Sequence, residues 1–78
     1  MNQAYLNYTI IIEKTSSSYG AYVPDLPGCV AVGNSKEEAL QLIQEAIVFH
    51  LEGMQDDGQL IPEPISTSET VRVCLKQD

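Results

Sequence analysis

A run of seventeen residues, 23–39, constrains the fold of this chain more than any other segment: VPDLPGCVAVGNSKEEA. Pro24 should end a strand because proline cannot donate to a sheet ladder, and Pro27-Gly28 has the composition of a tight turn. A short apolar strand should follow, and Gly33-Asn34 should end it just before a helix begins. The run therefore predicts strand, turn, strand and helix in that order. It contains no evident catalytic motif, which disfavours an enzyme.

One further strand is predicted ahead of this run. Residues 5–13 are rich in β-branched and aromatic side chains that alternate with a period of two, the pattern of a half-buried strand. The serine-rich segment 14–18 should connect it to an antiparallel second strand at 19–23, which pairs with a third at 29–32. The alternation places four side chains of the first strand toward the core: Leu6, Tyr8, Ile10 and Ile12.

A helix is predicted over residues 36–55. Ser35 is a good N-cap, and Glu38, three residues later, completes a capping box. Gly58 is a plausible helix end signal. Apolar residues recur at helical spacing and should cover one face of a sheet. They are Leu40, Ile43, Ile47, Leu51 and Met54, with Ala39, Leu42, Ala46 and Phe49 widening the stripe.

The C-terminal part of the sequence predicts a fourth strand. Residues 61–64, Ile-Pro-Glu-Pro, must be extended because proline disfavours helical backbone in the residue before it. Residues 70–76 alternate, with Val71, Val73 and Leu75 on the side expected to face the helix. The expected fold is α+β: a single domain over residues 1–78, of order β-β-β-α-β, with an antiparallel sheet carrying the helix on one face.

The composition excludes several classes of function. The net charge is −7 with only four lysines and arginines, so the basic patch that direct nucleic-acid binding requires cannot form. An acidic chain instead suits a basic protein partner. Cys29 and Cys74 match no metal or redox spacing and are expected to be reduced. Residues 1–4 do not resemble a secretion signal and no apolar run could span a membrane, so a cytoplasmic location without metal or cofactor is expected.

Several polar residues leave two interpretations open. Asp25, in the proline-rich turn, could cap a backbone amide or present its carboxylate to a partner. Glu52, Asp56 and Asp57 cluster toward the end of the helix, where they are either a solvated acidic end or a docking patch. His50 has no converging carboxylate or nucleophile evident in the sequence, so a structural or surface role is favoured over catalysis.

One face of the sheet should remain without a covering helix. The strand alternation assigns to this face Tyr5, Ile11, Tyr22, Cys29, Ala31 and Cys74. An uncovered apolar face is a candidate association surface for self-association or for a second protein. A core this small also favours pairing, since a 78-residue domain buries a modest fraction of its surface. A homodimer or larger homo-oligomer is therefore expected.

The ordered motifs resemble the core of HicB-type antitoxins. The similarity lies in residues 23–29 followed by 33–40, and it continues through 45–46 and 51–53 to 57–64, DGQLIPEP. The resemblance implies a partial RNase H-like fold without the catalytic acidic cluster. It also implies a partner, a HicA-type toxin, which is a small basic ribonuclease with a catalytic histidine. Many members of the family add a C-terminal DNA-binding segment, and no such domain is expected in these 78 residues.

Three functional hypotheses follow. The leading one is an antitoxin-like, non-enzymatic protein that binds and occludes a HicA-type ribonuclease. The alternative is a solitary homo-oligomeric binding or structural module with no toxin partner. A residual nuclease would need three or four carboxylates converging on Mg²⁺, and Glu13 with Asp25 does not complete such a set. The residues expected to contact a partner are Tyr22, Asp25, Cys29, Glu52, Asp56 and Asp57.

Overall fold

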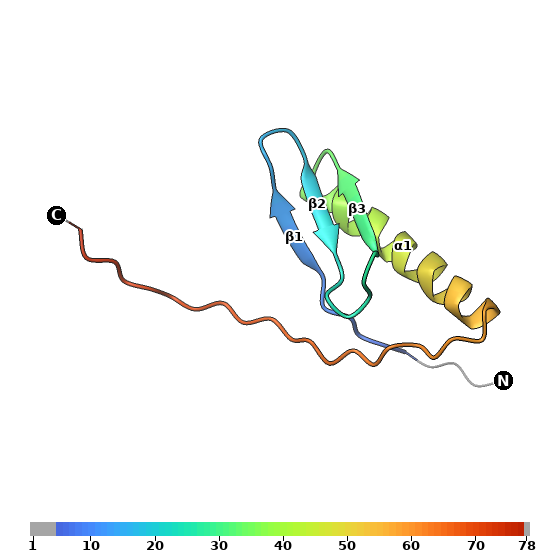
Figure 1. Ribbon diagram of the computed structural model, residues 1–78. Coiled ribbons are helices and arrows are strands. Elements are labelled where there is room, and N and C mark those ends of the chain that lie inside the picture. Colours follow the sequence, from blue (N-terminus) through green and yellow to red (C-terminus); the bar gives the residue numbers. More distant parts are fainter. Residues whose placement is uncertain (1–4, 78) are drawn as a thin grey trace.

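The computed structural model describes residues 5–77. Residues 1–4, which were expected not to be a secretion signal, and Asp78 lie outside the described part. Within it, three strands precede one long helix: β1 (Ile11–Lys14), β2 (Tyr19–Tyr22), β3 (Val30–Gly33) and α1 (Lys36–Asp56). The strands form one antiparallel sheet in the order β1-β2-β3 (Figure 1). The predicted α+β class, the three strands and the helix are confirmed.

The strand register decides which side chains face α1. Ile12 pairs with Ala21, and Ala21 pairs with Ala31, so these three lie in one row on the helix side of the sheet. Along the chain, Tyr8 and Ile10 precede β1 and lie on the same side as Ile12, and all three pack against the core. The predicted inward face of the first strand is thus confirmed from Tyr8 to Ile12, whereas Leu6 lies outside β1 and is exposed.

The opposite face of the sheet keeps only Ile11 and Tyr22 of the six residues predicted there. Tyr5 lies outside β1, and Cys74 lies in a segment that forms no strand within the described residues. Ile11 pairs with Tyr22, and Tyr22 pairs with Val30, so Tyr22 does lie on the face away from α1. Cys29 and Ala31 were expected there, but the same register places Ala31 beside buried Ala21, and Cys29 is buried in the core. The length of the turn at 24–28 sets this pairing, and a shift of one residue exchanges the two faces.

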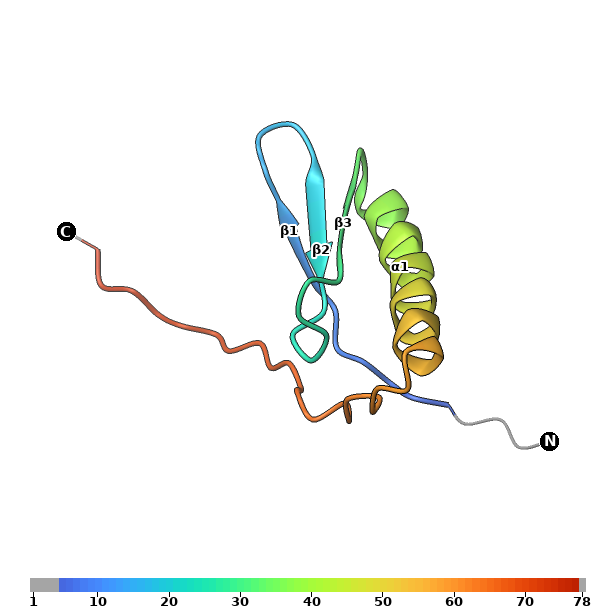
Figure 2. The same ribbon diagram turned by 45° about the vertical axis from the view of Figure 1, so that its right-hand side comes forward.

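The core lies between the sheet and α1, as the side-on view in Figure 2 shows. Its buried members among the described residues are Ala21, Val23, Leu26, Cys29, Ala39 and Ile43. The helix approaches β3 so closely that a Cβ on Gly33 would come within 2.7 Å of the backbone nitrogen of Ala39. Glycine at 33 therefore allows the strand and the helix to pack backbone against backbone.

Both ends of α1 lie where the sequence predicts. The Ser35 Oγ accepts a hydrogen bond from the Glu38 amide at 3.0 Å, and the Asn34 amide donates to Glu38 Oε1 at 2.6 Å. The Ser35 contact is the predicted N-cap, whereas Glu38 reaches back to the amide one residue before the N-cap and not to the Ser35 amide of a standard capping box. Gly58 follows the helix in the left-handed region, with φ of 71°. The buried stripe is narrower than predicted, because Leu40, Leu42 and Phe49 are exposed.

The predicted fourth strand is wrong for the described chain. Residues 67–77, called the arm below, contain no strand and run away from the sheet (Figure 1). The side chains of Val71, Val73 and Leu75 are 77%, 70% and 77% exposed. The radius of gyration is 15.7 Å, against roughly 12 Å for a compact chain of this length. Alternation alone does not make a strand, since the backbone must also find an edge to pair with.

Candidate partner-binding surfaces

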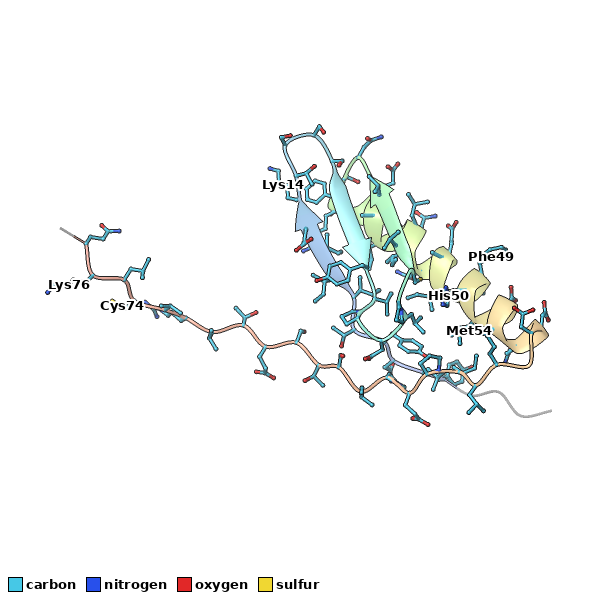
Figure 3. All side chains as sticks on the ribbon, in the orientation of Figure 1. Lys14, Phe49, His50, Met54, Cys74 and Lys76 are labelled. Carbon is cyan, nitrogen blue, oxygen red and sulfur yellow. The ribbon has the colours of Figure 1, made fainter. Side chains whose placement is uncertain are left out.

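An open groove lies between the start of β3 and the C-terminal half of α1. Its volume is about 430 Å³. Two of its lining residues, Gly28 and Gly53, have no side chain that could fill it. The Gly28 φ of 85° turns the chain into β3 at this point. Figure 3 shows Phe49, His50 and Met54 along α1. The lining is Gly28, Cys29, Val30, Ala46, Phe49, His50, Gly53, Met54, Asp57 and Gln59.

The groove is a suitable site for an apolar side chain of a partner. Phe49 is 80% exposed although it is a large aromatic side chain. Val30 also lines the groove, but it pairs with Tyr22, so its side chain lies on the face of the sheet away from α1. Aromatic side chains with the opportunity to become buried contribute much of the binding energy at protein interfaces. The groove therefore combines a concave shape with apolar side chains that the fold itself leaves uncovered.

Negative charge gathers at the end of α1 beside this groove. The acidic end of α1 is formed by Glu52, Asp56 and Asp57, all exposed, and the Asp57 side chain belongs to the groove lining. The last turn of the helix contains no basic residue. Carboxylates at a helix C-terminus oppose its dipole. Their position therefore does not stabilise the helix, which leaves the docking interpretation open.

Asp25 instead holds the segment that follows the helix. One carboxylate oxygen of Asp25 accepts from the Ser66 amide at 2.9 Å, and the other accepts from the Ser66 hydroxyl at 2.7 Å. Thr9 Oγ1 donates to the Ser66 carbonyl at 2.7 Å, and the Tyr8 hydroxyl donates to the Pro62 carbonyl at 2.5 Å. These four hydrogen bonds, called the clasp below, tie the segment 62–66, from which the arm begins, to Tyr8, Thr9 and Asp25. Residues 8–66 are called the body below.

The clasp perturbs two titratable groups. The hydrogen bond from the Ser66 amide, followed by that from the Ser66 hydroxyl, lowers the pKa of the Asp25 carboxyl. Burial, followed by the negative charges of Asp25 and Glu63, raises the pKa of the Tyr8 hydroxyl. Of the two interpretations left open for Asp25, binding of a backbone amide is the one observed. That amide lies 41 residues away and not in the aspartate's own turn.

The residues proposed from sequence do not form one surface. Glu52, Asp56 and Asp57 lie together, but Tyr22 is on the sheet face away from α1. Cys29 is 3% exposed, and this burial raises the pKa of its thiol. Cys29 is therefore a core residue that also belongs to the groove lining, with little exposed surface for contact with a partner.

The groove has no counterpart in the pattern of the sequence, which predicts Phe49 in the buried stripe. One available signal was Gly53, which is unfavourable in a helix interior by roughly 0.5–1 kcal/mol relative to alanine. A glycine that no packing contact requires suggests a position where another molecule approaches. No atom lies within 4 Å of a Cβ built on Gly53, so the glycine is not required by packing within the described residues.

The described residues offer no other chemical site. Within residues 5–77, no group of three or more His, Cys, Asp and Glu side chains is arranged to hold a metal ion. No helix in the same range is long and apolar enough to cross a membrane.

Comparison with protein families gives one match, which covers most of the chain. Residues 8–74 match the model of the HicB-like antitoxin of bacterial toxin–antitoxin systems. The matched range includes the body, the clasp and most of the arm.

The chain is also similar to individual proteins and to one solved structure. The chain is 45% identical over 72% of its length to an uncharacterised 14.9 kDa protein of Haemophilus phage HP1, of which it spans only 42%. It is 39% identical over 85% of its length to a UPF0150 protein of Thermoplasma acidophilum and spans 97% of that protein. A chain from the structure of a HicA3 and HicB3 toxin–antitoxin complex is similar with a TM-score of 0.66 and 32% identity, covering 77% of this chain and 70% of that one.

Proposed function

The chain belongs to the HicB-like antitoxin family of bacterial toxin–antitoxin systems, and from that premise we propose that it neutralises a small basic HicA-type ribonuclease by binding and covering it. The observation that carries the proposal is the structural similarity to a chain of the HicA3 and HicB3 complex. The proposed mechanism is occlusion without catalysis by this chain. A cytoplasmic location suits a protein with a ribonuclease partner.

We assign the docking surface to the groove together with the acidic end of α1. The two are contiguous through Asp57, and both lie on the side of the molecule where β3 forms the sheet edge. Tyr22 is assigned to a second, smaller contact on the sheet face away from α1. Asp25 is not assigned a direct contact with the partner, because both oxygens of its carboxylate are already bound to Ser66.

The two parts of the docking surface would act on different steps of binding. Exposed carboxylates attract a basic protein over a distance and raise the association rate, and salt weakens this effect. Phe49 and Met54 would be buried in the complex and would set the dissociation rate. An acidic chain with a net charge of −7 and an apolar groove fits a basic partner with an exposed apolar side chain.

The test is whether this chain binds a basic HicA-type ribonuclease and suppresses its cleavage of RNA. The variant Asp56→Asn with Asp57→Asn should slow association about tenfold at low salt and flatten its salt dependence. The matched control, Glu37→Gln with Glu69→Gln, removes the same charge away from the groove. Neutralising Asp56 and Asp57 should not unfold the protein, because these charges oppose the helix dipole.

A second pair of variants tests the apolar contacts. Phe49→Ala should raise the dissociation rate by at least about tenfold, since truncating an interface aromatic commonly removes more than 1 kcal/mol. Tyr22→Ala should have a smaller effect of the same kind. If the ribonuclease binds but none of these variants matters, the surface assignment is wrong. If no complex forms at micromolar concentrations, the antitoxin proposal fails and the solitary homo-oligomeric module becomes the better explanation.

A further inference from the structure

We propose that the arm forms the missing fourth strand on a second copy of this chain, pairing with the free edge of β1 in a reciprocal exchange. The proposal concerns self-association and does not depend on a toxin partner. It starts from the contrast between the arm's sequence, which has the alternation of a strand, and its observed state, which is extended and unpaired within the described residues.

The arm has the side chains of a half-buried strand but none of the burial. Val71, Val73 and Leu75 share one side of the extended chain, and each is at least 70% exposed. Arg72, Cys74 and Lys76 occupy the other side. Three large apolar side chains in water are unfavourable by roughly 25 cal/mol for each Å² of apolar surface that could be buried. An exposed extended segment of this kind commonly adds to the edge of another sheet.

The outer edge of β1 offers backbone groups with which the arm could pair. In the order β1-β2-β3, β1 is an edge strand, so one row of its backbone donors and acceptors has no strand partner among the described residues. The helix packs mainly on β3 and β2 and least on β1. As a result Tyr8, Ile10 and Ile12 are only partly buried on the helix side of the sheet. A strand added beside β1 would bring Val71, Val73 and Leu75 next to these side chains.

Charge also favours this pairing. Arg72 and Lys76 are two of the four cations of the whole chain, which has eleven carboxylates. With the apolar side of the arm toward the helix, Arg72 and Lys76 lie on the same face of the sheet as Glu13 of β1. Opposite charges on neighbouring strands stabilise their pairing.

The clasp explains why the strand forms on the second copy. Asp25 and Thr9 hold Ser66 at the start of β1, and from there the arm leaves its own sheet, as Figure 1 shows. If two copies exchange arms around a two-fold axis, both arms and both β1 edges become paired. The groove and the acidic end of α1 lie at the opposite, β3 edge, so the exchange would leave them accessible.

Disulfide trapping tests the exchange directly. Cys74 is exposed and Cys29 is buried, so Cys74 is the reactive thiol of the folded chain. We would introduce Ile11→Cys and Glu13→Cys separately, because both positions lie on the face expected to neighbour Cys74. Gln44→Cys, on the exposed surface of α1, is the control. Mild oxidation should give a covalent dimer through Cys74 in at least one β1 variant, with at least about tenfold more dimer than the control or the unmodified chain gives.

Two outcomes of the trapping experiment would contradict the exchange. A disulfide formed within one monomer would show that the arm pairs with its own β1, and the exchange would be wrong. Trapping no faster than in the Gln44→Cys control would show that the arm does not reach β1 at all, which also overturns the proposal.

Sedimentation gives an independent test without cysteine chemistry. The variant Val71→Asp with Val73→Asp should weaken the dimer at least roughly a hundredfold, because two carboxylates would replace apolar contacts. Gln41→Glu with Gln44→Glu adds the same charge on α1 and should leave the dimer intact. Both variants should keep the circular dichroism of the parent, since the changed residues are exposed. A monomeric parent chain, or a dimer indifferent to the arm variant, contradicts the exchange.

Discussion

The body and the arm contain the same kind of sequence pattern and reach different states. Residues 8–12 and residues 70–76 both place large apolar side chains at every second position, which are Tyr8, Ile10 and Ile12 in the first segment and Val71, Val73 and Leu75 in the second. The first segment leads into β1, which pairs with β2, and its inward side chains pack on the core. The second has no strand partner among the described residues, and its apolar side chains remain exposed. Alternation of side chains can be seen in a single segment, whereas a strand forms only when two segments pair with each other.

The junction between the two regions is stabilised differently from either of them. The clasp consists of hydrogen bonds from Tyr8, Thr9 and Asp25 to the backbone or side chain of residues 62–66. It positions the arm without burying it. The body should therefore be insensitive to changes in the arm in the monomer, and the arm should respond to changes at the clasp.

The largest difference between body and arm should appear in the core. Ile43 is fully buried, and Ile43→Ala should lower the free energy of unfolding by about 2–5 kcal/mol through lost burial and a cavity. Val73→Ala in the arm should change it by less than about 0.5 kcal/mol in dilute monomer. Urea denaturation at low protein concentration measures both. Equal losses at the two positions would show that the arm is packed in the monomer.

The next effect tests how tightly β3 and α1 approach. Gly33→Ala should lower the free energy of unfolding by about 1–3 kcal/mol, because the added Cβ would lie 2.7 Å from the Ala39 nitrogen. Gly53→Ala should instead raise it by about 0.5–1 kcal/mol, because alanine favours helix and the position is open. Thermal unfolding should separate the two variants by several degrees in opposite directions. Two shifts of the same sign would refute the close packing at Gly33.

A smaller difference is expected between two serines. Ser35→Ala removes the N-cap acceptor and should destabilise the body by about 0.5–2 kcal/mol. Ser68→Ala, in the arm, should leave the free energy of unfolding unchanged within about 0.5 kcal/mol. Helical circular dichroism during denaturation is the measurement. Loss of stability from the arm serine would mean that the body extends further along the chain than residue 66.

The smallest effect should be the acid dependence of the clasp. The folded-state pKa of Asp25 is below its ordinary value of 3.8, so its contribution is fully present above that value. It is lost as the pH falls through the lowered pKa and the carboxylate becomes protonated. Hydrogen exchange at the Ser66 amide, corrected for the intrinsic rate, should therefore become faster only below about pH 3.8. Asp25→Ala should abolish the protection at neutral pH, and protection unaffected by this change would contradict the clasp.

Local chemistry accounts for the features that the sequence predicts well. The turn at 24–28, the end of β3, the N-cap contact of Ser35 with Glu38, and the end signal at Gly58 each depend on side chains within a few residues of one another. Proline, glycine and capping serines limit the backbone directly, wherever the segment is placed. The acidic end of α1 was predicted for the same reason, since neighbouring residues on one helix remain neighbours in space.

The tertiary structure decided what depends on pairing across the chain. Register placed Cys29 and Ala31 on the helix side of the sheet, and helix packing left Phe49 exposed beside the groove. Asp25 found its partner 41 residues away, and residues 70–76 found no edge in the described monomer. The sequence by itself determined which segments prefer to be strand, turn or helix. Which strand has a neighbour, and which apolar face is covered, follows only from the arrangement of all the segments in space, because burial and pairing need a second surface.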